Sequence, residues 1–275
     1  MLFRSLQVAT SVQSSRNITL SGGTIKGGTW TLTGGAGLVV PALKSGTLDG
    51  VTLASDLTVA DRGNLTVVNG LTLSNAKVTL ACDSSDTVLQ FPSGTQTLGG
   101  TGEIIFGGTA PYGRIWAVGD NTPAGASVLT IGPGITVHGS QGGSISSYFA
   151  DDRIINQGTI ASETAGMTIT FAGTVVSNTG TIQATNGGNL SVTNLADAKG
   201  LSVTGGGTLT LDGTWTNSGT ISETNSTVNL RGTFSFPGSG TISRSGGTVN
   251  ILGVLDNTAD TLVLNAATGS LNLLG

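Results

Sequence analysis

The sequence is poor in charged and aromatic residues. Only 9% of its 275 residues are charged and 4% are aromatic, whereas charged residues make up about a quarter of an ordinary globular protein. The net charge is −4 and the mean hydropathy is +0.23, which excludes the low hydrophobicity and high charge of a disordered chain. No basic patch is present for nucleic acid or for an anionic membrane. We therefore expect no nucleic-acid partner and no membrane insertion by this segment.

Cysteine and histidine are almost absent, because Cys82 and His138 are the only residues of their types. One cysteine cannot form an intrachain disulfide, and one histidine cannot alone supply a metal site or a Ser-His-Asp triad. No segment has the roughly 20 apolar residues that cross a bilayer, and residues 1–10 are too short and polar for a signal peptide. The sequence predicts no cofactor and no metal, and we expect any export signal to lie outside this chain.

Glycine is abundant, with 45 residues, but it lacks the Gly-X-Y period of collagen. From about residue 155 onward, apolar residues instead recur every 19 to 22 positions in three interleaved columns. The first column is Ile160, Ile182, Leu201, Ile221, Ile242 and Leu262. The second is Ile169, Leu190, Leu209, Val228, Val249 and Leu271. The third is Val175, Leu195, Trp215, Phe234 and Leu255.

Within each repeat, apolar residues alternate with small polar ones, as in Gly207-Thr208-Leu209-Thr210-Leu211. This period of two is typical of a strand with one buried face, and helical spacing is absent. Turn-forming segments such as Asn217-Ser218-Gly219 separate the strands. Three short strands cannot bury their inner faces alone, but stacked repeats can. The sequence thus predicts an all-β, single-stranded, right-handed parallel β-helix with three strands per rung of about 19–24 residues.

The predicted domain organisation is one continuous β-solenoid over residues 1–275, with roughly a dozen rungs. Residues 1–106 have longer, less regular rungs, marked by glycines at 23, 46, 70 and 94. Residues 107–155 are irregular rungs with one or two side loops, and residues 156–275 are regular rungs. The last five residues, 271–275, stop inside a rung without a polar cap, so we expect a fragment of a longer protein.

The irregular region concentrates prolines, aromatic residues and acids. Exposed aromatic rings on loops often form carbohydrate or partner surfaces. Candidates for contact with a glycan or a protein partner are Tyr112, Trp116, Asp120, His138, Tyr148, Asp151 and Asp152. His138 considered alone fits a solvated or turn position. Elsewhere, Trp30 and Trp215 alternate with threonines, which favours core positions, and Cys82 fits a small buried hydrophobe.

Several phrases, such as Gly46-Thr47-Leu48-Asp49-Gly50-Val51-Thr52-Leu53 and Asn156-Gln157-Gly158-Thr159-Ile160, resemble the Gly/Thr/Asn-rich repeat regions of large bacterial surface proteins. These regions are similar in style to autotransporter passengers and filamentous-haemagglutinin-type adhesins. The resemblance covers nearly the whole chain. It implies a β-helix and a stalk or adhesive role on the bacterial surface. The export signal and the anchoring end of such proteins do not occur in this sequence.

An enzymatic alternative follows from the fold class, because many parallel β-helices act on polysaccharides. Glycoside hydrolysis needs two carboxylates about 5 to 9.5 Å apart. Asp61, Asp83 and Glu103 lie about one rung apart, but each follows its nearest marker glycine at a different distance. This predicts that the three do not form a column. Asp151 and Asp152 are adjacent, so on a strand they would face opposite ways, and a turn or loop cluster is favoured.

The glycines and threonines bear on two further ligands, calcium and ice. The calcium-binding repeat Gly-Gly-x-Gly-x-Asp needs an acid at its sixth place, but segments 34–39 and 99–104 carry valine and isoleucine there. Thr-x-Thr pairs at 29/31, 168/170, 208/210 and 214/216 make ice binding a remote alternative. The segment Thr227-Val228-Asn229 interrupts that pattern.

The functional hypothesis from sequence is a non-enzymatic, structural or adhesive segment of an exported bacterial surface protein. Its location would be extracellular or at the cell surface, and its partners a surface glycan or protein ligand together with neighbouring rungs of the parent chain. A polysaccharide-active lyase or hydrolase with the same fold is the alternative.

Overall fold

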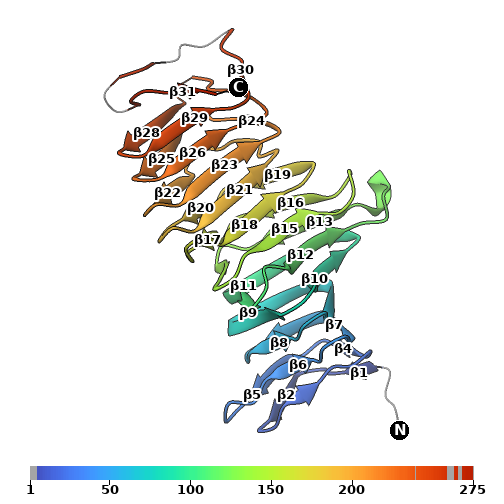
Figure 1. Ribbon diagram of the computed structural model, residues 1–275. Helices are drawn as coiled ribbons and strands as arrows, with labels where there is room; N and C mark the ends of the chain where they lie inside the picture. Colours follow the sequence, from blue (N-terminus) through green and yellow to red (C-terminus); the bar gives the residue numbers. More distant parts are fainter. Residues whose placement is uncertain (1–4, 239, 259–262, 266–267, 275) are drawn as a thin grey trace.

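Strands stack on their equivalents one turn later along the whole molecule. The computed structural model describes residues 5–238, 240–258, 263–265 and 268–274. It is an all-β parallel solenoid of about 12 turns with essentially no helix (Figure 1). The short 3₁₀ helix η1 (Pro123–Gly125) is the one helical segment of the described part of the chain. The predicted fold class is confirmed.

Each turn contributes strands to three ladders, here called L1, L2 and L3 in chain order. L1 contains β1 (Ser5–Gln7), β4 (Thr24–Lys26), the start of β7 (Ser45–Leu53) and of β9 (Asn64–Cys82), β10 (Thr87–Pro92), β12 (Gly113–Val118), β15 (Gly143–Ser147), β18 (Thr168–Ala172), β21 (Asn189–Thr193), β23 (Thr208–Asp212), β26 (Thr227–Leu230), β29 (Thr248–Ile251) and β31 (Asn272–Leu273). These strands form the longest ladder.

L2 and L3 follow the same order. L2 contains β2 (Ser11–Ser14), β5 (Thr29–Leu32), later parts of β7 and β9, the start of β11 (Gly94–Gly108), β13 (Ser127–Ile131), β16 (Arg153–Asn156), β19 (Val175–Asn178), β24 (Thr214–Thr216), β27 (Thr233–Ser235) and β30 (Val254–Leu255). L3 contains β3 (Ile18–Thr19), β6 (Leu38–Val40), β8 (Leu57–Val59), the ends of β9 and β11, β14 (Ile135–Gly139), β17 (Thr159–Ser162), β20 (Thr181–Ala184), β22 (Ser202–Thr204), β25 (Thr220–Thr224) and β28 (Thr241–Ser245).

Long strands bend around the corners in the amino-terminal half, which joins the ladders there into one continuous sheet. Gly100 shows how a corner is made in β11. Its φ is +82°, and a Cβ atom at this position would lie 2.0 Å from the carbonyl oxygen of Leu73 on the preceding turn. Only glycine permits both the left-handed backbone and this close approach.

The predicted apolar columns are interior columns with matching register. Ile160 pairs with Ile182 and Ile221 with Ile242 in L3, while Leu209 pairs with Val228 in L1. The buried apolar residues form one core cluster that runs along the rod. Burial of each such Ile or Leu contributes about 1.5–3 kcal/mol, and because neighbouring turns supply the contacts, the stabilisation is local.

Predictions for single residues in the core are also confirmed. Trp30, Trp215 and Cys82 are buried, and the Trp215 ring stacks on Phe234 of the next turn with centroids 4.5 Å apart and planes 3° apart. The third column needs one correction. Val175 is 40% exposed, and its neighbour Val176 is the buried residue that bridges to Leu195.

That correction follows from strand alternation, since two adjacent residues of a strand point to opposite faces. The first column also included Leu262, which lies outside the described residues.

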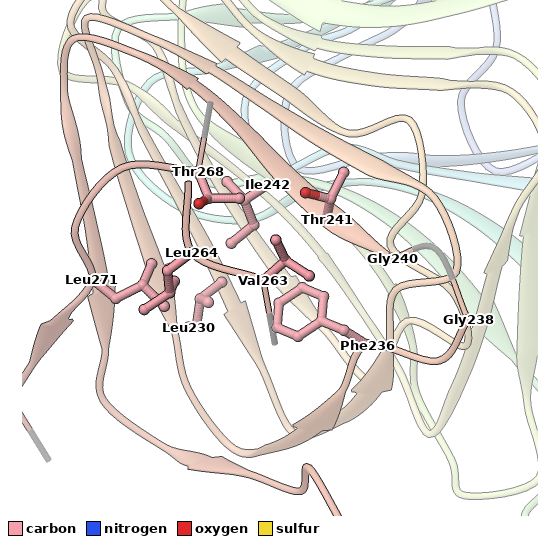
Figure 2. Close-up of a pocket in the computed structure, with 10 residues that line it drawn as sticks. All are labelled: Leu230, Phe236, Gly238, Gly240, Thr241, Ile242, Val263, Leu264, Thr268 and Leu271. Carbon is pink, nitrogen blue, oxygen red and sulfur yellow. The ribbon is translucent and has the colours of Figure 1, made fainter. Parts of the chain in front are cut away.

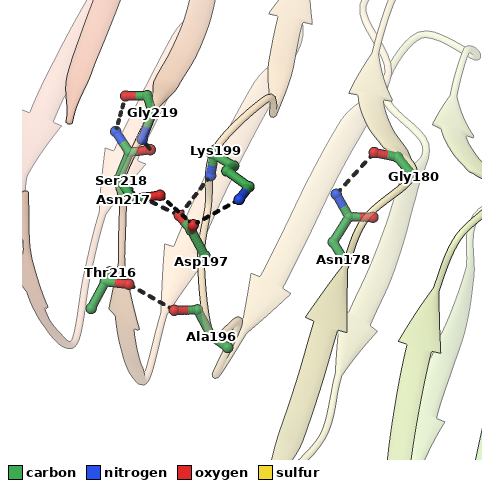
Figure 3. A network of polar contacts seen from close by, with 9 residues as sticks. All are labelled: Asn178, Gly180, Ala196, Asp197, Lys199, Thr216, Asn217, Ser218 and Gly219. Atoms are coloured by element: carbon green, nitrogen blue, oxygen red, sulfur yellow. Dashed lines mark hydrogen bonds and ion pairs between the residues drawn. The ribbon is translucent and has the colours of Figure 1, made fainter. Parts of the chain in front are cut away.

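Buried asparagines close the corner between L2 and L3. The Asn156 side-chain amide donates to the Asn178 Oδ1 atom on the next turn (2.7 Å) and to the Gly158 carbonyl oxygen. Asn178 donates to the carbonyl of Gly180 in the same way (Figure 3). The Gly158 carbonyl also accepts from the Thr181 N–H on the next turn, so the Asn side chain two residues earlier adds a second donor at the corner. The Asn-x-Gly turns seen in the sequence therefore have side chains that face inward.

Candidate functional site

Two side loops distinguish the irregular turns from the others. Residues 119–126, between β12 and β13, include η1 and project from the side of the rod as a green loop, and residues 148–152 leave β15 beside them (Figure 1). Both loops lie at the corner between L1 and L2. Side loops were predicted for this region, and these two lengthen its turns.

Asp152 fastens the two loops together. Its side chain is fully buried, and its carboxylate accepts hydrogen bonds from the backbone N–H groups of Gly119, Ser127 and Phe149 at 2.8–3.0 Å. The prediction that Asp152 contacts a partner is therefore wrong, because its oxygen atoms are directed into the protein. Asp152 instead positions the surrounding loop.

The other two acids of this region occupy different positions. The Asp120 carboxylate is exposed and accepts from the backbone N–H and the hydroxyl of Thr122 in its own loop. Asp151 is half-buried and makes no hydrogen bond within the described part of the chain. Of these two, Asp120 has a side chain that is both exposed and ordered by a local turn.

An aromatic strip crosses the outer face of L1 beside the loops. We define it as Tyr112, Arg114, Trp116, Tyr148 and Phe149. Arg114 and Trp116 alternate with buried residues of β12 and so point outward. Trp116 meets Tyr148 edge to face with ring centroids 5.5 Å apart, and Tyr148 meets Phe149 at 4.9 Å. Tyr112 lies 5.8 Å from the Arg114 guanidinium carbon.

Polar side chains border the strip and hold its one cation. The Arg114 guanidinium donates to Asp86 at 3.0 Å and to the Ser144 hydroxyl at 3.3 Å. In the strand register, Gln90 and Ser146 are the L1 neighbours of Trp116 on the preceding and following turns. Ring faces and hydrogen-bonding groups thus alternate on one surface.

His138 does not belong to this surface. It lies on L3, where its Nε2 atom is 3.4 Å from Glu103 and its Nδ1 atom 3.2 Å from Glu163. Lys77 also contacts Glu103 at 3.1 Å, and this hydrogen bond is the main reason that the pKa of Glu103 is lowered. The two glutamates contact opposite nitrogens of the His138 ring. A metal ion bound to one of these nitrogens could therefore not also be bound by both glutamates.

Several aspartates act as clips between successive turns, which the sequence reasoning missed. Asp61 accepts from the backbone N–H groups of Asp83 and Ser84 on the next turn, and Asp83 accepts in turn from Thr109. The expectation that Asp61, Asp83 and Glu103 do not form a column is confirmed, although Asp61 and Asp83 lie close together on successive turns. Glu103, in contrast, lies away from them on the L3 face. The Ser84 hydroxyl is the largest cause that lowers the pKa of Asp61 to about 2.

Asp197 repeats this clip at the corner between L2 and L3. Its carboxylate accepts from the backbone N–H and hydroxyl of Ser218 on the next turn and contacts the Lys199 ammonium at 3.6 Å (Figure 3). Burial raises its pKa, but the donors from Ser218 and Lys199 outweigh burial, and the net shift is downward. With lowered pKa values, Asp61 and Asp197 are anions at neutral pH and donate no proton.

The threonine pairs do not make one continuous array. Thr29 and Thr31 lie on L2, whereas Thr168 and Thr170 lie on L1. Between the L1 pairs on β18 and β23, strand β21 places asparagine and serine at the equivalent outward positions. Threonine is thus one of several small polar residues on the solvated strand faces.

An apolar cavity of about 140 Å³ lies near the carboxyl-terminal end of the rod (Figure 2). Its walls come from the interior columns and from the segment that follows β30, and they include Leu230, Phe236, Ile242, Val263 and Leu271. Its lining is mainly apolar, like that of the core. No charged residue is among the described residues that line it.

The described residues contain neither a metal-binding cluster nor a helix that could cross a membrane. No group of three or more His, Cys, Asp or Glu side chains is arranged there to hold a metal ion. No described helix has the length and apolar character needed to cross a membrane.

Comparison with known proteins returns no similar protein. No family model matches the chain, and neither a curated protein nor a solved structure is detectably similar to it. The fold and the geometry above therefore carry the functional argument.

Proposed function

We propose that this chain is a non-enzymatic, structural and adhesive segment of an exported bacterial surface protein. It works as a rod that displays a binding surface, and its place is extracellular or on the cell surface. The solenoid of about 12 turns supports this proposal, since stacked turns project a surface over a distance with few residues. The resemblance of the Gly/Thr/Asn-rich repeats to surface-protein stalks supports the location.

The observation that carries the proposal is the aromatic strip on L1. Tyr112 and Tyr148 are 44% and 58% exposed, although most large apolar side chains of this protein are in the core. Exposed aromatic rings grouped on a rigid scaffold mark a binding surface more often than they stabilise a fold. The Asp152 clamp holds the neighbouring loops in place, which preorganises that surface.

Two acids weighed for the polysaccharide-cleaving alternative, Asp61 and Glu103, have pKa values shifted the wrong way for a proton donor. Glycoside hydrolysis needs one carboxyl group with a raised pKa. The pKa of Asp61 is lowered by hydrogen bonds from the next turn, and that of Glu103 chiefly by Lys77. We therefore propose binding without cleavage.

The test uses the full chain on two assays. Binding is measured to immobilised glycans, matrix proteins and bacterial cells, and release of reducing sugars is measured on the same polysaccharides. We expect saturable binding to at least one surface without new reducing ends. A Tyr112→Ser, Tyr148→Ser double variant should lose that binding and keep its thermal transition. Reducing-sugar release would establish the enzymatic alternative, and an absence of binding to all surfaces would refute the display role.

A further inference from the structure

We infer that the aromatic strip binds a neutral oligosaccharide that lies along strand β12. This inference deepens the proposed function and rests on it, because it assigns a ligand class to the displayed surface. Sugar rings present an apolar C–H face and a rim of hydroxyl groups. A site for them needs aromatic faces with hydrogen-bonding groups beside them.

The indole of Trp116 satisfies this requirement and differs from the other two tryptophans. The Nε1–H groups of Trp30 and Trp215 donate to the carbonyl oxygens of Gly27 and Arg231. The Nε1–H group of Trp116 has no such partner among the described residues, and neither do the hydroxyls of Tyr112 and Tyr148. Three polar groups on the strip are thus free to bind a ligand.

The charge of the strip favours a neutral ligand. Arg114 is its one cation, and that guanidinium is already engaged by Asp86 and Ser144 and lies near the Tyr112 ring. An anionic glycan would have to compete with Asp86 for it. No free cation of the strip remains for a carboxylate or sulfate.

The size of the strip favours a glycan over a protein. A stable protein interface buries about 800 Å² on each partner around a desolvated centre, but of the five strip residues only Tyr112 and Tyr148 count as exposed. The strand rise gives about 13 Å from Tyr112 to Trp116, which suits two or three sugar rings of a longer chain. Ser146 and Gln90 border that path with a hydroxyl and an amide group, respectively.

The experiment titrates the full chain with cellohexaose, mannohexaose and chitohexaose, and with hexagalacturonate as the anionic comparison. Calorimetry measures affinity, and tryptophan emission reports on Trp116, since Trp30 and Trp215 are only 1% and 2% exposed. We expect a neutral hexasaccharide to bind and to shift the emission. Trp116→Ala should weaken binding about tenfold or more, and Trp116→Phe, which keeps a ring but loses the N–H, should lie between.

His138→Ala is the matched control, because His138 lies on L3, and it should bind like the wild type. Tyr148→Ala tests the same strip if Trp116→Ala does not fold. Binding of hexagalacturonate alone, or equal binding by both strip variants and wild type, would overturn the inference. If the chain adheres to proteins or cells but to no hexasaccharide, the inference fails and the display function stands. If it adheres to nothing, both fail.

Discussion

Replacing Asp152 with alanine removes the carboxylate that joins the two side loops beside the aromatic strip. Three backbone N–H groups, of Gly119, Ser127 and Phe149, lose their acceptor. A hydrogen bond to a charged group contributes about 1.5–3 kcal/mol. Water can replace the carboxylate at the half-buried Gly119 and Phe149, but Ser127 is fully buried. We expect a local loss of about 3–5 kcal/mol.

The assay is native-state hydrogen exchange on the intact chain. In Asp152→Ala, the amides of Gly119, Ser127 and Phe149 should exchange faster, while those of β23 and β26 should keep their rates, since solenoid stability is local. Asp151→Ala is the control and should change stability by less than about 0.5 kcal/mol, because Asp151 makes no hydrogen bond within the described residues. Unchanged protection of the three amides in Asp152→Ala would refute the clamp.

Three further predictions concern the rod itself. Ile221→Asp places a carboxylate in a fully buried L3 column and should cost several kcal/mol; an unchanged thermal transition would contradict the inward position. Asn217→Ala removes its side-chain hydrogen bonds to the half-buried Gly219 and Thr241 carbonyls, and the Gly219 carbonyl keeps the Thr241 N–H as a donor. The variant should cost about 0.5–1.5 kcal/mol for each lost bond, measured by urea unfolding. The folded-state pKa of Asp61 is about 2, below the unfolded value of about 3.9, so its stabilisation is present above pH 4 and lost as the pH falls through about 2. Asp61→Asn should thus melt lower than wild type at pH 6, and the two melting temperatures should converge near pH 2, whereas a constant difference would count against the clip.

The sequence predicts the interior well where each turn repeats the last. Residues such as Ile160 and Ile182 could be aligned because no insertion separates their strands, and alternation then assigns their faces. The alignment fails where one residue shifts the phase, as at Val175 and Val176. Two adjacent valines fit the column equally well, and only packing selects between them.

The clips were missed because the marker glycines change their structural role. Gly46 lies in an L1 strand opposite Leu65, whereas Gly94 begins the part of β11 that belongs to L2. The number of residues between an aspartate and its nearest marker glycine therefore does not give the position of that aspartate within a turn. The contact of the Asp61 carboxylate with the backbone of Asp83 and Ser84 could be found only once the strand register is known.

The candidate site was predicted as a region but not as an arrangement. The concentration of aromatic residues in 107–155 is visible in the sequence, yet the two side loops lengthen the turns and hide the proximity of Trp116 to Tyr148. The same loops determine that Asp152 faces inward. No periodicity in the sequence contains that information.

The direction of the hydrogen bonds gives the rod a particular mechanical behaviour. Strands β1 and β31 lie at opposite ends (Figure 1), and the bonds of the ladders run from turn to turn between those ends. Tension between the ends acts on every turn in series, but the outermost turn has a neighbour on one side only and therefore peels away first. Such a rod would lengthen in small, separate steps under flow, with each step releasing one turn of chain while the remaining turns stay folded.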